Sequence, residues 1–142
     1  MTNNNDYNRK KEIIDKLFLK EEDVIAKLER LVKLAESFLK IEANSNRVIL
    51  NNEFDLTNSE KIFLILLGKY LAFQHGSIQN SNLKLKDISE ELGSIPVTTL
   101  SSKASILKND RIIIKPTEDT YQVNPHEIEK FLKKIYNKYV EK

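Results

Sequence analysis

The stretch DISEELGSIPVTTLSSKASILKNDR, residues 87–111, decides the fold that the sequence predicts. It begins as a short amphipathic helix, and Gly93 provides the stop signal for this helix. Pro96 stands at or beside the start of a second helix, where a missing N–H costs nothing. The second helix is predicted to bury four apolar residues at helical spacing, Val97, Leu100, Ala104 and Leu107. Two helices joined by a short glycine turn are the outline of a helix-turn-helix.

Further patterns lie on both sides of this stretch. Upstream, LTNSEKIFLILLGKYLAF (residues 56–73) is apolar on nearly every side, which predicts a central buried helix. Thr57 and Glu60 have the capping-box spacing at its start. Downstream, RIIIK (111–115) and TYQV (120–123) predict two strands of a β-hairpin joined by PTED.

The ends of this core are predicted to add a strand and a helix. RVILNNEF (residues 47–54) indicates a strand or a short hairpin. The apolar residues after Pro125 recur at helical spacing, which predicts a C-terminal helix in residues 126–142. The predicted fold class is therefore mainly α with a small β-hairpin.

The N-terminal third has a different pattern. Residues 1–8 are polar and asparagine-rich, and we expect a disordered lead-in there. Residues 9–42 contain no Gly or Pro and carry a heptad-like apolar stripe, which predicts a long, coiled-coil-like helix with a possible break at KEED (20–23). Such a helix would be about 50 Å long, whereas a domain of about a hundred residues is only about 26 Å across.

Part of this stripe therefore needs a second surface to cover it. We expect a homodimer formed by residues of the stripe, namely Leu17, Val24, Leu28, Leu31, Ala35 and Phe38. The alternative is that the stripe folds back onto its own domain.

The composition limits the classes of function. A chain of 142 residues without cysteine has no disulfides and no thiolate metal site, and its net charge of +2 alone predicts no polyanionic partner. The longest apolar run, IFLILL (62–67), is too short to span a membrane, and MTNNNDYNRKK at the N-terminus lacks the apolar core of a signal peptide. We therefore expect a cytoplasmic protein with no membrane partner.

The sequence also lacks the motifs of enzymes. It contains no Gly-rich phosphate loop, no nucleophile elbow and no catalytic cluster. His75 and His126 have no other ligand-type residue at metal-binding spacing. We expect a protein that is not an enzyme and needs no cofactor or metal, and no effector site is visible in the sequence.

The order of these elements resembles the winged helix-turn-helix superfamily of archaeal and bacterial transcription regulators. The residues that carry the resemblance are LKLKDISEELGSIPVTTLSSKASILKNDRIII (83–114), supported by SEKIFLILLGKYLA (59–72) and IKPTEDTYQV (114–123). The resemblance implies a winged domain at about residues 47–125, whose helix 96–109 lies in the DNA major groove. It implies that the hairpin, or wing, and the flanking amides hold phosphates.

The side chains that would read DNA follow from helical geometry. At about 100° per residue, with the apolar side turned inward, the outward residues of this helix are Thr98, Ser102, Ser105 and Asn109, with Thr99 and Lys103 on the flanks. Hydroxyl groups can hydrogen-bond base edges, and a Thr methyl can contact a thymine methyl. The predicted phosphate contacts are Lys103, Lys108, Arg111 and Lys115.

Charge leaves the choice of partner open. Residues 77–125 contain six basic and six acidic side chains, so DNA binding requires that the two signs lie on different faces. No acid occurs between Gly93 and Asn109, but the hairpin tip PTED is acidic, and Glu118 and Asp119 are left out of the site. The predicted function is a homodimeric transcription regulator that binds double-stranded DNA. The alternatives are a protein–protein interaction module in a larger complex and an architectural chromosome protein, against which the mild net charge argues.

Overall fold

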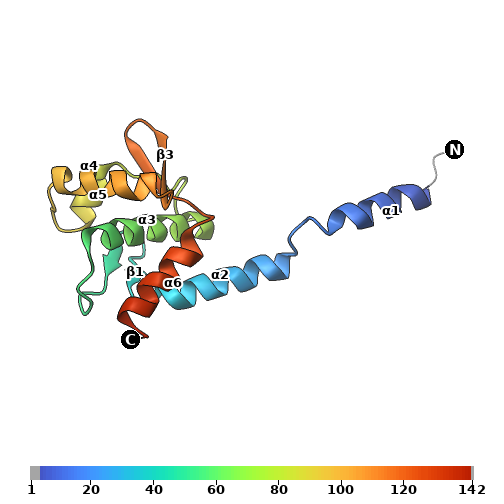
Figure 1. Cartoon of the computed structure of the whole chain (residues 1–142), viewed down its shortest axis with the longest axis horizontal. Coiled ribbons are helices and arrows are strands. Elements are labelled where there is room, and N and C mark those ends of the chain that lie inside the picture. The colour runs from blue at the N-terminus through green and yellow to red at the C-terminus, as the bar shows by residue number, and fades with distance from the viewer. Residues whose placement is uncertain (1–3, 142) are drawn as a thin grey trace.

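The structure, a computed structural model, describes residues 4–141, and in this part the chain is mainly helical with two small antiparallel sheets (Figure 1). This confirms the predicted class of mainly α with a little β. The elements in chain order are α1 (Asn4–Asp15), α2 (Glu21–Ala35), β1 (Leu39–Ile41), β2 (Val48–Leu50), α3 (Asn58–His75), α4 (Leu85–Glu91), α5 (Val97–Asn109), β3 (Ile113–Thr117), β4 (Thr120–Val123) and α6 (Ile128–Tyr139). None of the helices in the described part combines the length and the apolar character needed to cross a membrane.

Helix α3 is the centre of the core, as its composition predicts. The capping box is present at its start: the Glu60 N–H donates to Thr57 Oγ1 at 3.2 Å, and the Thr57 N–H donates to Glu60 Oε1 at 2.8 Å. Every residue from Ile62 to Gly68 is buried. Helices α4 and α5 and strands of both sheets contact this helix, Phe131 of α6 packs on Phe63, and α2 packs on α6.

The first sheet packs on α3 at Gly68. Strands β1 and β2 pair antiparallel, with Leu39 opposite Leu50 and Ile41 opposite Val48. A Cβ atom at position 68 would lie 2.4 Å from Val48 Cγ2, closer than van der Waals contact allows. The absence of a side chain at Gly68 is therefore what lets β2 approach the helix.

The turn between α4 and α5 is fixed by its backbone. Gly93 and Ser94 have positive φ angles of 80° and 70°. The Ser94 N–H donates to the Ser89 carbonyl at 2.8 Å, and Ser89 Oγ donates to the carbonyl of Ile95 at 2.5 Å. These contacts close the turn and set the angle at which α5 leaves it.

Helix α5 buries three of the four predicted residues, Leu100, Ala104 and Leu107. The prediction for Val97 is wrong, because 43% of this residue is exposed. Val97 is the first residue of the helix, and helical side chains tilt toward the N-terminus. At this position the side chain therefore points past the core.

Strands β3 and β4 form the predicted hairpin. Ile113 lies opposite Val123, and Thr117 lies opposite Thr120. Leu83 extends the hairpin by one bridge, because its N–H and carbonyl both bond to Tyr121. The helix expected in 126–142 begins later, at Ile128, and ends at Tyr139.

The N-terminal third differs most from expectation. Helix α1 starts at Asn4, so residues 4–8 of the predicted disordered lead-in are helical, and residues 1–3 lie outside the described part. The prediction of one helix over 9–42 is wrong: a non-helical linker at 16–20 separates α1 from α2, and α2 ends at Ala35. Residues 39–41 form a strand instead, because they pair with β2.

The stripe predicted to form a dimer is divided between two environments. Leu31, Ala35 and Phe38 are buried in the core of the same chain, which contradicts their assignment to a dimer interface. Phe38 packs against the rings of Phe54, Tyr136 and Tyr139. The alternative of folding back is therefore correct for this half of the stripe, whereas its other three members, Leu17, Val24 and Leu28, are exposed.

Candidate nucleic-acid interface

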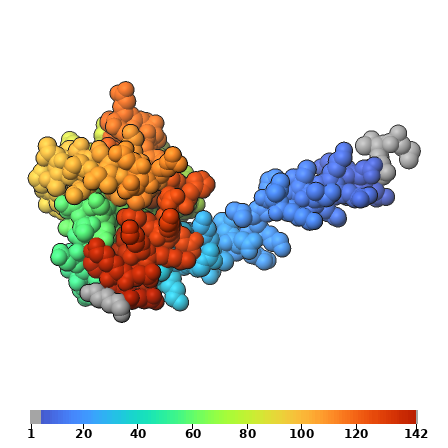
Figure 2. All heavy atoms as spheres, in the orientation of Figure 1, coloured from blue at the N-terminus to red at the C-terminus, as the bar shows by residue number. Residues whose placement is uncertain are grey.

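The outward face of α5 is free of other elements. The nine side chains predicted to contact DNA are all exposed. Seven belong to α5, Arg111 follows its end, and Lys115 lies on β3. Figure 2 shows α5 and the hairpin at the surface of the same part of the molecule, on the side away from the C-terminus. The C-terminal helix α6 packs elsewhere, against α2.

The N-terminus of α5 is uncapped. Pro96 occupies the N-cap position without a side-chain hydrogen bond, and the first turn contains no acidic residue. The carbonyl of Pro96 accepts bonds from the N–H groups of Thr99 and Leu100 at 3.0 and 3.2 Å, which leaves those of Val97 and Thr98 without a partner in the described chain. Free N–H groups and the helix dipole together favour an anion at this position.

The C-terminal end of α5 is held by Asn124. Arg111 has a positive φ of 64°, an uncommon conformation for a residue with a side chain. The Asn124 side chain donates to the Arg111 carbonyl at 2.8 Å, and the Asn124 N–H donates to the Ile112 carbonyl at 3.0 Å. These bonds fix the point where the chain passes from α5 into the hairpin, and they keep Arg111 beside the end of the helix.

One carboxylate near α5, that of Glu91, is bound by partners on other elements. Glu91 pairs with Lys69 at 3.0 Å and accepts the Val48 N–H at 2.9 Å. Asp87 and Glu90 line a hollow with Glu91, Lys69 and Arg47, on the side of α4 that meets the first sheet.

The hairpin tip is neutralised in part. Asp119 pairs with Lys84 at 3.4 Å and accepts the Thr117 hydroxyl. The Thr117 hydroxyl and Lys84 hold the pKa of Asp119 below its usual value. Glu118 has no such partner among the described residues.

Three cations remain unpaired beside the outward face. In the part of the chain that the structure describes, Lys103, Lys108 and Arg111 have no carboxylate within ion-pair distance. Asp110 is the nearest acid in sequence and is exposed at the end of α5. Basic and acidic side chains are thus largely separated: unpaired basic residues lie along α5, and most acidic residues lie on α4 and at the hairpin tip.

Lys115 is separated from this group. Its ammonium lies 5.5 Å from the centre of the Tyr121 ring, in a cation–π contact on the hairpin. Lys115 is therefore engaged with Tyr121, unlike the three unpaired cations beside α5.

Two residues of the outward face were missed from the sequence. Ser101 is exposed, and Ile106 is 51% exposed. Both fall on the outward half of the helix at about 100° per residue, so the spacing that identified Ser102 and Thr98 contains them too. Ile106 gives this otherwise polar face an apolar member.

Other kinds of site are absent from this surface. Within residues 4–141, no three His, Asp or Glu side chains are grouped to hold a metal ion. A hollow of about 710 Å³ lies between α2, β1 and the end of α3 and not at α5. The His75 ring nitrogen Nδ1 at its edge lies 2.5 Å from Ser77 Oγ.

Comparison of the chain with family models, curated proteins and solved structures finds no match.

Proposed function

We propose that this chain is a winged helix-turn-helix protein that binds double-stranded DNA and places α5 in the major groove. The observation that carries the proposal is the outward face of α5: it is uncovered, rich in hydroxyl groups, and has no carboxylate between Gly93 and Asn109. A helix with such a face fits the width of the major groove.

Each part of the face has a role in this proposal. The hydroxyls of Thr98, Ser102 and Ser105 contact base edges, and Asn109 adds an amide. The unpaired cations Lys103, Lys108 and Arg111 contact phosphates and supply most of the affinity. The free N–H groups at the start of α5 hold a further phosphate.

Within this proposal the protein is a homodimer that regulates transcription by occupying an operator. Leu17, Val24 and Leu28, the exposed members of the stripe, form the dimer contact. Two copies present two α5 helices to successive turns of the duplex, which doubles the contacts of a module with few cations.

A protein–protein interaction module remains the second candidate. It is favoured by exposed apolar residues around α5, since Val97, Ile106 and Ile114 are each exposed by more than a third. Apolar side chains of this kind stabilise a protein–protein interface when they are buried, whereas contact with phosphates stabilises them little.

Binding to DNA fragments at two salt concentrations separates the two candidates. Fluorescence anisotropy with labelled genomic fragments is expected to show binding that weakens steeply as salt rises, because each neutralised phosphate releases counterions. Replacement of Lys103 by Ala is expected to reduce this salt dependence. Absence of binding to any fragment at low salt contradicts the DNA proposal and favours the interaction module.

A further inference from the structure

The side chains of the N-terminal arm, residues 5–30, are not buried by the rest of the chain. Every side chain in it is exposed, and Arg30 at its end pairs with Glu129 of α6 at 3.3 Å. Figure 2 shows α1 and the linker projecting away from the domain. The arm nevertheless carries nine large apolar residues, Tyr7, Ile13, Ile14, Leu17, Phe18, Leu19, Val24, Ile25 and Leu28. A 12-residue helix such as α1 is marginal alone in water, and an apolar surface of this extent marks a binding site.

A groove and a hollow that are apolar over much of their surface, with Glu29, Lys33 and Glu36 at their borders, lead from the arm onto the domain. Ile25, Leu28 and Val32 line a shallow groove on α2. Val32 also lines the 710 Å³ hollow, which continues between α2, β1 and the end of α3. We call this the α2–α3 hollow; its apolar lining includes Ala35, Leu39, Ile41, Leu71 and Ala72.

The charges along α2 select the direction of a partner helix. The first turn of α2 carries Glu21, Glu22 and Asp23, and its last turn carries Lys33. In an antiparallel pair of α2 helices the acidic turn of one copy lies beside Lys33 of the other, and the two helix dipoles are antiparallel. In a parallel pair the two acidic turns lie side by side and repel each other.

The same arrangement brings the linker to the hollow. Ala35, which lines the hollow, is seven residues after Leu28. Leu19, which lies in the linker, is nine residues before Leu28. At the rise of an α-helix, the helical segments 28–35 and 21–28 are each roughly 10 Å long, and the non-helical residues Leu19 and Lys20 lie just beyond Glu21. A two-fold axis near Leu28 therefore places the linker of one copy over the hollow of the other.

We infer that two copies of this chain associate antiparallel through α2, and that each inserts Leu17, Phe18 and Leu19 into the α2–α3 hollow of the other. The inference deepens the homodimer proposed above and rests on it. The contact is isologous, so the two copies bury the same surface and the assembly closes at two. A lipid surface is a poorer occupant of the arm, because its seven basic and seven acidic residues leave no net positive charge to attract anionic headgroups.

Disulfide cross-linking tests the direction. The chain contains no cysteine, so introduced cysteines are the only thiols. A mixture of Asp23→Cys and Lys33→Cys chains, one with a tag that changes its mass, is oxidised without DNA. The expected product is the mixed 23–33 disulfide. A majority of 23–23 and 33–33 disulfides overturns the antiparallel arrangement.

The mass in solution tests the insertion of the linker. Light scattering is expected to give a dimer for the full chain, and Phe18→Asp is expected to raise the dimer dissociation constant by at least about tenfold, because a charge is moved into an apolar hollow. Circular dichroism of this variant is expected to be unchanged, since Phe18 is exposed in the monomer. Ile49→Asp, at an exposed apolar residue of β2 outside the arm and the hollow, is the matched control and should leave the dimer intact.

Three results overturn the inference: a monomeric full chain, a dimer that Phe18→Asp leaves unchanged, and a monomer whose arm binds vesicles of phosphatidylglycerol. None of these measurements involves DNA. Failure here therefore leaves the DNA proposal standing, and failure to bind DNA leaves the dimer standing.

Discussion

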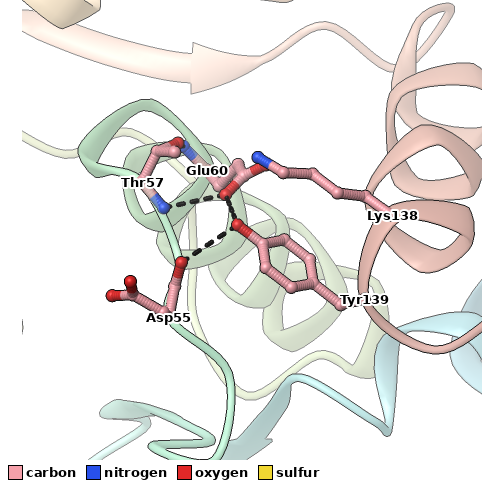
Figure 3. A network of polar contacts seen from close by, with 5 residues as sticks. All are labelled: Asp55, Thr57, Glu60, Lys138 and Tyr139. Atoms are coloured by element: carbon pink, nitrogen blue, oxygen red, sulfur yellow. Dashed lines mark hydrogen bonds and ion pairs between the residues drawn. The ribbon is translucent and has the colours of Figure 1, made fainter. Parts of the chain in front are cut away.

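The phenolic oxygen of Tyr139 lies 2.5 Å from Oε1 of Glu60, and this contact joins the end of α6 to the start of α3 (Figure 3). The same hydroxyl lies 3.1 Å from the Asp55 carbonyl, and Lys138 Nζ lies 3.0 Å from Glu60 Oε2. Burial opposes ionisation of Glu60, but hydrogen bonds from Tyr139, the Thr57 N–H and Lys138 outweigh it. The pKa of Glu60 therefore lies below its usual value of 4.5.

Removal of the Tyr139 hydroxyl is expected to destabilise the fold. Tyr139→Phe takes one donor from a buried carboxylate, and the loss in free energy of unfolding should be about 1.5–3 kcal/mol. Urea denaturation at neutral pH measures it. Tyr136→Phe is the matched control, because the Tyr136 hydroxyl has no hydrogen-bond partner in the described chain. Equal effects of the two substitutions contradict a specific role for the Glu60 contact.

The stability of the fold is expected to fall in acid through Glu60. Its folded-state pKa is below the unfolded value, so the folded state binds fewer protons. The stabilisation is present above about pH 4.5 and is lost as the pH falls through the folded-state pKa. Glu60→Gln should lower the stability at neutral pH and flatten its decline in acid. Parallel curves of unfolding free energy against pH, for this variant and the natural chain, argue against the assignment.

Gly68→Ala is expected to destabilise the chain although Ala favours helix. The added Cβ would lie 2.4 Å from Val48 Cγ2, so β2 must move away from α3. The expected cost is about 1–3 kcal/mol in free energy of unfolding. Val48→Ala in the same chain removes the clashing methyl groups and should make the cost of Gly68→Ala smaller. A cost that is the same in both backgrounds places the strain elsewhere.

Substitutions on α5 are expected to separate affinity from sequence preference. Lys103→Ala and Arg111→Ala should weaken binding to all DNA sequences, and each should lower the salt slope by about 1. Ser102→Ala should alter the preference among sequences by about 1 kcal/mol, the value of one hydrogen bond. Lys130→Ala, an exposed lysine on α6, is the control for loss of charge. Losses equal to that of the control place the binding surface away from α5.

Local periodicity was enough to predict the helices of the core. The capping box at Thr57 and the inward residues Leu100 and Ala104 depend on neighbours within one or two turns, and the structure has them as expected. The end of α2 depends on distant residues. Residues 36–42 contain good helix formers, but pairing of β1 with β2 outweighs their helix propensity.

The same distinction applies to the candidate site. Helical spacing identified the outward residues of α5 from the sequence. Helical spacing could not predict which acidic side chains are paired, because Glu91 pairs with Lys69 and Asp119 pairs with Lys84. In each pair the two residues are far apart in the sequence. A count of six acids against six bases therefore understated the positive character of the α5 surface.

The ion pair between Lys84 and Asp119 has a consequence for the length of DNA that one copy would cover. It is exposed to solvent and therefore weak, so a phosphate group can displace Asp119 from Lys84. The released carboxylate, together with Glu118, would then repel the same nucleic-acid backbone. A copy bound through α5 should therefore hold the hairpin tip away from the adjacent minor groove, and nuclease protection should extend over little more than one major-groove segment per copy.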